Sequence, residues 1–207
     1  MCCLACLPCF KGDSDHWRPS SVTRFRADCL TKDGRFCCEF TQLGLVRIGF
    51  PSKDPSNSPP IQFDSEPIPG LFPVDIPTAW IEQTHRAVHD CLEGARLGEL
   101  PPYDLQGSEF QQRVWSALCA IPLGETRSYG EIADGIGNPG AVRAVGRACG
   151  ANPLPLLIPC HRVLAADGKL GGFSGGMGWK PLLLAREGWS SGRDLPLFQN
   201  RNEPDSS

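Results

Sequence analysis

Residues 158–163 read IPCHRV, which places a cysteine and a histidine side by side behind an apolar run at residues 154–158. A thiol becomes a strong nucleophile only as its thiolate, and a nearby imidazole is the usual means of generating one near neutral pH. Neighbouring residues rarely face each other, so the adjacency alone is weak evidence. A structural cysteine in the core, the commoner fate of a buried thiol, is the competing interpretation of Cys160. The apolar run is too short and too rich in proline for a helix. We therefore predict a buried extended segment that ends at Cys160.

Upstream of this stretch, residues 128–150 follow the pattern of a helix, a tight turn and a second helix. Ser128 and Glu131 have the spacing of a capping box that opens the first helix. Gly137 can adopt the left-handed conformation that ends a helix, and Asn138-Pro139 predicts the N-cap and first-turn proline of the next one. This order is typical of a helix-turn-helix.

The second of these helices, residues 141–150, is unusual for its small side chains. Small residues allow a helix backbone to approach another surface closely, and Arg143 and Arg147 project from it one turn apart. Binding to a polyanion explains this pattern. A helix packed tightly inside its own domain, with two solvated arginines, explains it as well.

Downstream, residues 171–178 contain five glycines in eight positions. The segment lacks the Gly-Lys-Ser/Thr ending of a phosphate-binding loop, which excludes a nucleoside triphosphate site of that type. It suits close approach of the backbone to a flat ligand, and a flexible surface linker is the competing interpretation. Residues 181–188 then predict a short closing helix that carries Glu187.

The N-terminal half is predicted to contain a small sheet and one helix. Asp33-Gly34 is a strong hairpin signal between strands at residues 25–30 and 36–40, and residues 45–50 predict a third strand. Residues 51–77 contain eight prolines and predict an irregular surface crossing. Thr78 is predicted to cap a helix whose apolar face consists of Ile81, His85, Val88, Leu92 and Ala95.

Pro101-Pro102 is predicted to end that helix and to separate two domains. After it, Ser108 and Gln111 form a capping box for an amphipathic helix that carries Trp115 and stops before Pro122. We expect an N-terminal domain at residues 21–100 and a C-terminal domain at residues 101–190. The ends, residues 1–20 and 191–207, are expected to be disordered tails.

Composition sets further bounds. The formal charge of −3 gives no indication of nucleic-acid binding, although residues 108–192 hold eight Lys/Arg against six Asp/Glu, a balance that permits it. Eleven irregularly spaced cysteines cannot all pair, which favours a reducing cytoplasmic compartment, or the nucleus if the host is eukaryotic. No apolar run approaches the roughly 20 residues of a membrane span, so no membrane partner is expected.

Taken together in order, these motifs closely resemble those of the O6-alkylguanine-DNA alkyltransferase family. The resemblance is strong over about residues 100–190 and loose over residues 25–97, where it includes Thr41 and Leu43-Gly44. The matching positions of the strong part are Asp104, Gly107-Ser108, Phe110-Gln111, Val114-Trp115, Asn152-Pro153, and residues 159–163, 174–176 and 185–188.

The resemblance implies a set of catalytic residues. Cys160 matches the cysteine that accepts the alkyl group, and Glu187 and His161 match a relay that removes the thiol proton through a water molecule. Asn152 matches an asparagine that braces the turn before the active-site segment. Tyr129 matches a tyrosine that protonates the departing guanine and crowds the 3′ phosphate of the target nucleotide.

The resemblance also implies double-stranded DNA carrying alkylated bases as the partner, bound by a monomer. The alkylated base must leave the duplex to react, and Arg143 matches the arginine that fills the vacated stack. Its helix is expected in the minor groove, where close approach matters more than base reading. The implied DNA contacts are Arg143, Tyr129, Ala141, Ala144, Gly146 and Arg147. The implied pocket for the flipped base is formed by Ser174, Val163, Phe173, Pro155 and Gly171.

Several positions depart from the family pattern. Phe173 stands where the family commonly has tyrosine, which removes a hydroxyl from the pocket rim. Cys149 and Gly150 replace bulkier or basic residues near the end of the recognition helix, which is expected to weaken DNA affinity. We expect no cofactor and no metal. A structural zinc in the N-terminal domain is a weak alternative with Cys6, Cys29 and His85 as candidate ligands, and Cys2, Cys3, Cys9 and His89 as further ones.

The resemblance therefore implies an α/β protein with a small N-terminal mixed domain, composed of an antiparallel sheet and a helix. A mostly helical C-terminal domain with a winged helix-turn-helix-like element is expected to follow it. The implied activity is stoichiometric transfer of an alkyl group from O6-alkylguanine, and secondarily O4-alkylthymine, to Cys160 in a single turnover. A lesion-sensing relative without transfer activity is the alternative, although such relatives lack the acceptor cysteine. A cysteine hydrolase is a third class, but no oxyanion hole or distant histidine is indicated.

Overall fold

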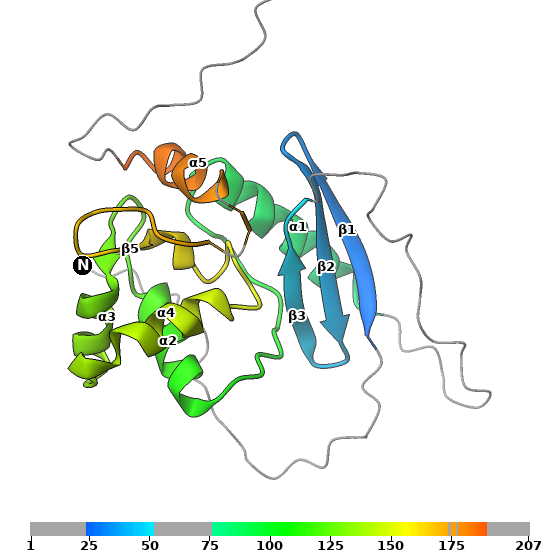
Figure 1. Ribbon diagram of the computed structural model, residues 1–207. Coiled ribbons are helices and arrows are strands. Elements are labelled where there is room, and N and C mark those ends of the chain that lie inside the picture. The colour runs from blue at the N-terminus through cyan, green and yellow to red at the C-terminus, as the bar shows by residue number, and fades with distance from the viewer. Residues whose placement is uncertain (1–23, 52–75, 174, 177, 190–207) are drawn as a thin grey trace, which may run out of the picture.

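The computed structural model describes residues 24–51, 76–173, 175–176 and 178–189. Figure 1 shows a three-stranded sheet with helix α1 beside it, and a group of shorter helices on the other side of the molecule. The predicted tails at residues 1–20 and 191–207 lie outside the described residues, as does most of the proline-rich crossing. The mixed α/β class predicted from the sequence is confirmed.

The sheet is antiparallel in the order β1-β2-β3. Strands β1 (Phe25–Thr31) and β2 (Gly34–Thr41) form the predicted hairpin, and Thr31 pairs with Gly34 across its turn. Gly34 has a φ of +123°, a conformation that favours glycine. Strand β3 (Gly44–Gly49) completes the sheet, close to the predicted third strand. Its outer edge is extended by the segment after the proline pair, because Leu45 N–H donates to the Pro102 carbonyl at 2.8 Å.

Helix α1 spans Thr78–Leu92, and two details of its prediction were wrong. Pro77, not Thr78, occupies the N-cap position, and no side chain caps the helix. The helix also ends earlier than Pro101, because Gly94 takes a left-handed φ of +65° and Ala95 N–H donates to the Asp90 carbonyl at 2.8 Å. This is a Schellman ending, and it leaves Ala95 outside the helix and exposed. The buried face consists of Thr84, Ala87, Val88, Cys91 and Leu92.

The C-terminal helices begin where their caps predict. Helices α2 (Glu109–Cys119) and α3 (Tyr129–Gly135) each have a complete capping box, with Ser108 and Ser128 as the respective N-cap residues. A two-residue strand β4 (Arg127–Ser128) precedes α3 and pairs in parallel with β5 (Val163–Leu164).

The junction between α3 and α4 agrees with the predicted positions of Asn138 and Pro139, but it contains an additional 3-10 turn and no side-chain cap. Gly137 adopts the predicted left-handed φ, at +71°. Pro139 then opens a short 3-10 helix, Pro139–Ala141, and α4 (Val142–Gly150) follows with Ala141 at its N-cap. The Asn138 side chain does not cap either helix. Its amide instead lies 3.5 Å from the Ile136 carbonyl, so the proline rather than the asparagine side chain starts the second helix.

The apolar run at residues 154–158 is buried as predicted, but it is not extended. Leu156 has a φ of +80°, and Ile158 N–H donates back to the Leu154 carbonyl at 2.9 Å. The run is therefore a tight turn, followed by a 3-10 helix at Cys160–Arg162. A leucine in the left-handed region is strained, and the surrounding packing must hold it there.

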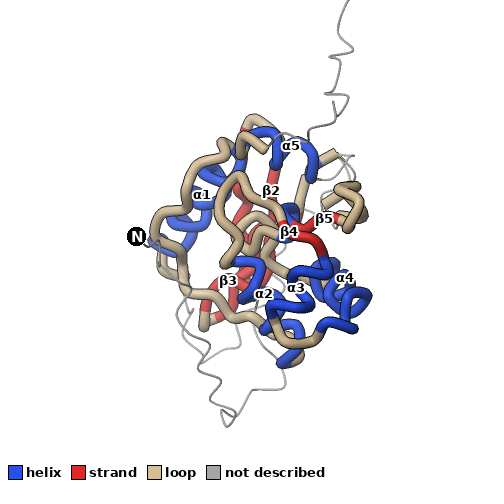
Figure 2. The backbone as a smooth tube through the Cα atoms, turned by 90° about the vertical axis from the view of Figure 1, so that its left-hand side faces the viewer, coloured by secondary structure: helices blue, strands red, loops and turns tan. Residues whose placement is uncertain are grey.

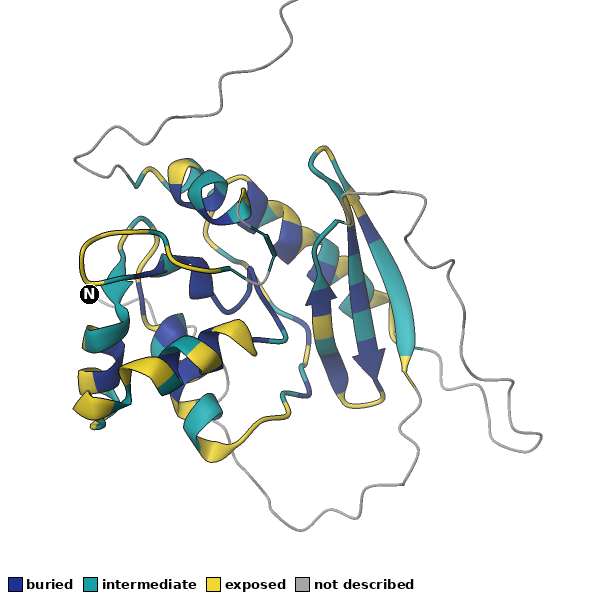
Figure 3. Cartoon of the chain, viewed as in Figure 1, coloured by how far each residue is buried: buried dark blue, intermediate teal, exposed yellow. Residues whose placement is uncertain are grey.

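One continuous core joins the sheet to the helices, including Phe36, Leu45, Trp115, Val145 and Leu183. The tube in Figure 2 shows the sheet behind the helices, with β4 and β5 between α3 and α5 (Trp179–Arg186). In Figure 3 the buried residues gather on the surfaces that the sheet, α1 and the C-terminal helices turn toward one another. Trp115 ties two of these helices, because its Nε1 donates to the Ala148 carbonyl at 2.9 Å.

The close approach of α1 and α5 gives the first testable prediction. A Cβ added to Gly94 would lie 2.0 Å from the Arg186 carbonyl oxygen. We expect Gly94→Ala to lower the free energy of unfolding for two reasons. The left-handed backbone at this position disfavours alanine by about 1–2 kcal/mol, and the clash of the added methyl group costs about 1–3 kcal/mol more. Urea denaturation measures the change. Gly98→Ala is the matched control, since nothing lies within 4 Å of its added Cβ, and an equal loss in both variants would contradict the prediction.

Candidate active site

A cavity of about 400 Å³ lies at the C-terminal end of α4. Cys160 and Tyr129 line it together with the small residues Gly146, Gly150 and Gly172. Its remaining lining residues are Cys149 and Phe173. The cavity therefore combines a buried thiol, a phenol and walls that admit a planar group at short range.

Asn152 fixes the turn that carries Cys160. Its side-chain amide donates to the Ile158 carbonyl at 2.8 Å, and its side-chain oxygen accepts from Leu154 N–H at 3.0 Å. The two bonds hold both ends of the turn that contains Leu156. Asn152 therefore contacts the turn through both of its side-chain polar atoms, and it is itself buried.

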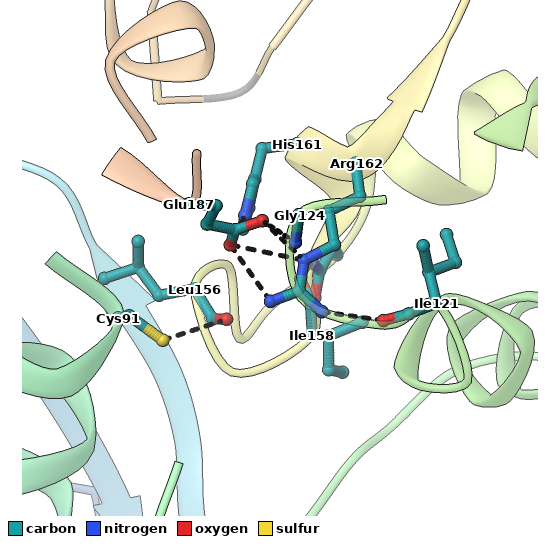
Figure 4. Close-up of polar contacts among 9 residues, drawn as sticks. Cys91, Ile121, Gly124, Leu156, Ile158, His161, Arg162 and Glu187 are labelled. Atoms are coloured by element: carbon teal, nitrogen blue, oxygen red, sulfur yellow. Dashed lines mark hydrogen bonds and ion pairs between the residues drawn. The ribbon is translucent and has the colours of Figure 1, made fainter. Parts of the chain in front are cut away.

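His161 and Glu187 lie in direct contact, as Figure 4 shows. His161 Nε2 is 2.8 Å from Glu187 Oε1, although the two residues are 26 positions apart in sequence. Arg162 binds the same carboxylate through two nitrogens, with Nε 2.9 Å from Oε2 and Nη2 2.9 Å from Oε1. Its Nη1 also donates to the Ile121 carbonyl at 2.7 Å. The carboxylate is therefore held by an imidazole and a guanidinium together.

The charges in this network determine which histidine nitrogen carries the proton. Burial alone raises the pKa of Glu187, but hydrogen bonds from His161 and Arg162 hold it at about 2, so the carboxylate is ionised. Burial lowers the pKa of His161, which keeps the imidazole neutral near pH 7. An ionised carboxylate can only accept hydrogen bonds, so Nε2 carries the proton. The Nδ1 lone pair is then free, and this buried atom has no partner among the described protein atoms.

Burial raises the pKa of the Cys160 thiol, while a hydrogen bond from Asn152 and the charge of Lys180 oppose that effect. Lys180 is fully buried, and its ammonium donates to the Val163 carbonyl at 2.6 Å. The same ammonium lies 5.9 Å from the centre of the Tyr129 ring. Burial raises the pKa of Tyr129, so its hydroxyl stays protonated and can act as a donor. Lys180 therefore places a positive charge beside both side chains.

The residues expected to contact DNA lie on α4 and the 3-10 turn before it, except for Tyr129, which begins α3. Arg143 and Arg147 are exposed on α4, and Ala141 and Ala144 are partly exposed. Gly146 reaches the cavity wall, where Tyr129 also lies. On α4, Gly146 therefore faces the cavity, while Arg143 and Arg147 face the solvent.

The residues expected to hold the flipped base are more scattered. Phe173 lines the cavity. Gly171 has a φ of +64°, and a Cβ added to it would lie 3.5 Å from the Tyr129 hydroxyl oxygen. Val163 is buried and contributes its carbonyl to Lys180. Pro155 lines a neighbouring cavity of about 590 Å³ instead. Ser174 lies outside the described residues.

Two of the weak zinc candidates, Cys29 and His85, lie in the part of the chain that the structure describes. Cys29 is a buried residue of β1 and His85 is on α1. Among the described residues, no group of three or more His, Cys, Asp or Glu side chains could hold a metal ion. Cys6 lies outside the described residues, so the zinc alternative stays a prediction.

Sequence reasoning missed three residues of the site. No role was predicted for Arg162 or Lys180, and Cys149 was treated as a departure from the family pattern in the recognition helix. Only Arg162 could have been identified from the sequence as a residue of the site, because it directly follows the Cys160-His161 pair. Lys180 is an isolated lysine next to a proline, and nothing local predicts that its ammonium is buried.

The C-terminal part of the chain matches a family model. Residues 109–189 match the model described as the DNA-binding domain of 6-O-methylguanine DNA methyltransferase. Among curated proteins, the methylated-DNA–protein-cysteine methyltransferase of Mycobacterium tuberculosis strain H37Rv is 55% identical over 113 residues, which cover 53% of this chain and 68% of that protein. The chain belongs to the methylated-DNA–protein-cysteine methyltransferase family.

Another member of the family, from Methanosarcina acetivorans, is 47% identical over 125 residues, which cover 58% of this chain and 80% of that protein. The crystal structure of Mycobacterium tuberculosis OGT in complex with DNA matches with a TM-score of 0.59 and 38% identity, covering 79% of this chain and 91% of that one. The O6-methylguanine DNA methyltransferase structure from Methanococcus jannaschii matches with a TM-score of 0.54 and 28% identity, covering 83% and 99%. The family therefore accounts for both the sheet-bearing half and the helical half.

Within this family member, an ion pair connects the N-terminal hairpin to the residue next to Glu187. Arg186 Nη1 and Nη2 each lie 2.8 Å from a carboxylate oxygen of Asp33. Both side chains are largely buried, with exposed fractions of 22% and 15%. A hydrogen bond from Arg186 lowers the pKa of Asp33. The hairpin turn thus anchors the end of α5 from which the Glu187 carboxylate projects.

We expect a double-mutant cycle of Asp33→Asn and Arg186→Gln to give a coupling free energy of about 1 kcal/mol, because the pair is bidentate and shielded from water. Urea denaturation of the four proteins measures it. The Lys32–Glu93 pair is the control, since its side chains are 62% and 40% exposed and its coupling should stay below about 0.5 kcal/mol. Equal coupling in the two pairs would show that burial does not strengthen the Asp33–Arg186 contact.

Proposed function

We propose that this protein repairs alkylated DNA by transferring the alkyl group of O6-alkylguanine to Cys160. The observation that supports this most strongly is the position of Cys160 on a cavity, next in the chain to His161, which contacts Glu187 at 2.8 Å. Family membership supplies the reaction class, direct alkyl transfer to a cysteine. The roles of the individual residues are part of the proposal.

The proposed step is a single displacement at the alkyl carbon. His161 Nδ1 takes the thiol proton, through a water molecule as the family resemblance implies, and Glu187 stabilises the imidazolium that results. Cys160 Sγ then bonds to the alkyl carbon while the bond from that carbon to O6 breaks. The electron pair stays on the guanine, which takes a proton from Tyr129. The products are guanine and S-alkylcysteine, and no described residue offers a route that would regenerate the thiol.

Substrate entry requires the target nucleotide to leave the duplex. We propose that α4 lies in the minor groove with Arg143 in the vacated stack, because its small residues allow close approach and Arg143 is exposed. Contacts of this kind read shape and phosphates, so affinity is expected to depend weakly on sequence and strongly on salt. O4-alkylthymine is proposed as a secondary substrate, as the family resemblance implies.

A lesion sensor that binds without transfer is the less favoured alternative, because the chain retains the cysteine and its complete network. We propose action as a monomer, since the cavity, its nucleophile and the exposed arginines lie on one chain. None of the described helices is long and apolar enough to cross a membrane. A cytoplasmic location, or a nuclear one in a eukaryote, would give the proposed activity both DNA and reduced thiols.

The test is to incubate the protein with a duplex that contains one O6-methylguanine and to weigh the intact chain. The expected result is one methyl in place of one hydrogen, mapped to Cys160 by peptide sequencing, with no gain in Cys160→Ala. Tight binding to the lesion without a mass gain would support the sensor instead. Release of many product molecules per protein would contradict a single-turnover reaction.

A further inference from the structure

The cavity that holds Cys160 also holds a second thiol. Cys149, in the last turn of α4, lines the same 400 Å³ space, and both residues are almost fully buried. The other free cysteines of the described chain do not line it: Cys29, Cys37, Cys38, Cys91 and Cys119. Alkyl transfer needs one acceptor sulfur, so the proposed reaction leaves Cys149 without a role.

Two neighbours connect the thiols. Asn152 N–H donates to the Cys149 carbonyl at 3.3 Å, while its side chain holds the Ile158 carbonyl two residues before Cys160. Lys180 is placed within electrostatic range of both sulfurs. Burial raises the pKa of each thiol, that of Cys149 to about 12, and the lysine charge opposes the shift in each case. The two thiols are therefore protonated in the resting protein, and both line the same cavity.

We propose that Cys149 and Cys160 form a paired-thiol site that binds trivalent arsenicals, with one arsenic atom bonded to both sulfurs. The cavity is large enough for an aryl substituent, and its small glycine walls admit a flat ring. Binding to the two thiols is independent of the repair reaction. Only the consequence, that an occupied site cannot accept an alkyl group, rests on the proposed function.

The binding step is balanced without an oxidant. An aryl arsenic oxide reacts with two thiols to form two As–S bonds, and its oxygen leaves with the two thiol protons as one water molecule. Arsenic remains trivalent and both sulfurs remain at the thiol oxidation level. A protein with only one thiol in the cavity forms one such bond, which a free monothiol displaces by exchange. Two bonds to a preorganised pair raise retention by roughly 10²–10⁴-fold through effective concentration.

The test uses the full chain with Cys2→Ser, Cys3→Ser, Cys6→Ser and Cys9→Ser, because the N-terminal cysteines are a second potential dithiol. This background receives one equivalent of phenylarsine oxide and is titrated with glutathione, and native mass spectrometry counts the retained adduct. We expect Cys149→Ser to release the adduct at a glutathione concentration about 10²-fold lower. Cys119→Ser, which removes a partly buried thiol outside the cavity, should match the background. The dithiol 2,3-dimercaptopropanol should remove the arsenical from both proteins.

Equal retention in the background and in Cys149→Ser would overturn the proposal, as would loss of retention in Cys119→Ser. Cys149→Ala provides the same comparison if the serine variant does not fold. Methyl acceptance from an O6-methylguanine duplex is measured separately, before and after the arsenical. A chain that accepts the methyl group but shows no paired retention contradicts only the paired-thiol site. A chain that retains the arsenical but never accepts a methyl group contradicts only the proposed repair function.

Discussion

Glu187→Gln is expected to slow alkyl transfer by roughly 10²–10⁴-fold, the range associated with a positioned proton acceptor. The substitution keeps the shape of the side chain but removes the charge that orients His161 and stabilises its protonated form. Single-turnover transfer to Cys160, measured at saturating DNA, reports the chemical step. An unchanged rate would exclude His161 and Glu187 as the relay.

The same substitution should also destabilise the fold. Glu187 and Arg162 are 3% and 14% exposed, and removing one partner of a buried pair costs about 3–5 kcal/mol. The pKa of Glu187 in the folded protein, about 2, is below its ordinary value of about 4.3. Its contribution to stability is therefore complete above about pH 4.3 and is lost as the pH falls toward 2.

Urea denaturation from pH 7 to pH 3 tests this dependence. The acid-side loss of stability should be shallower in Glu187→Gln than in the wild type. Glu125→Gln is the matched control, because Glu125 pairs with Arg127 at 2.9 Å but the two side chains are 50% and 41% exposed. Its effect should stay below about 1 kcal/mol. An unaltered acid slope in Glu187→Gln would contradict the assignment of the carboxylate as ionised in the folded protein.

Arg143→Ala is expected to slow transfer from duplex DNA by about 10²-fold, because an extrahelical base costs a few kcal/mol to maintain and this side chain is proposed to fill the gap. Transfer from a free O6-alkylguanine base should be unaffected, since no base has to be flipped. The ratio of the two rates is the measurement. A loss with both substrates would indicate damage to the cavity rather than loss of a stacking residue.

Arg147→Ala is the control for this variant, since Arg147 is exposed one turn further along α4. A phosphate contact at this position should weaken DNA binding uniformly and lower the slope of log affinity against log salt by about 0.9. The rate of transfer from bound duplex should change little. If Arg147→Ala matched Arg143→Ala in the rate of bound duplex, the two arginines would not have separate roles.

Local signals in the sequence predicted most of the elements correctly. The Asp33-Gly34 hairpin and the capping boxes at Ser108 and Ser128 depend on residues within four positions of each other, so the sequence is sufficient to place them. The errors have more than one physical cause. At Gly94 a local helix-ending signal was passed over. In the turn around Leu156, tertiary packing holds a backbone that local preference disfavours.

The sequence by itself determined the reactive groups of this protein: a thiol with an adjacent imidazole, a carboxylate that follows the last helix as its C-cap, and two arginines on a helix of small residues. It could do so because residue type and short-range spacing define the chemistry and the family. Only the tertiary structure decided which groups meet. Arg162 holds Glu187, Lys180 is buried beside Tyr129, and Cys149 shares the cavity of Cys160. These contacts join segments far apart in the chain, and their formation depends on how the core packs rather than on any local pattern.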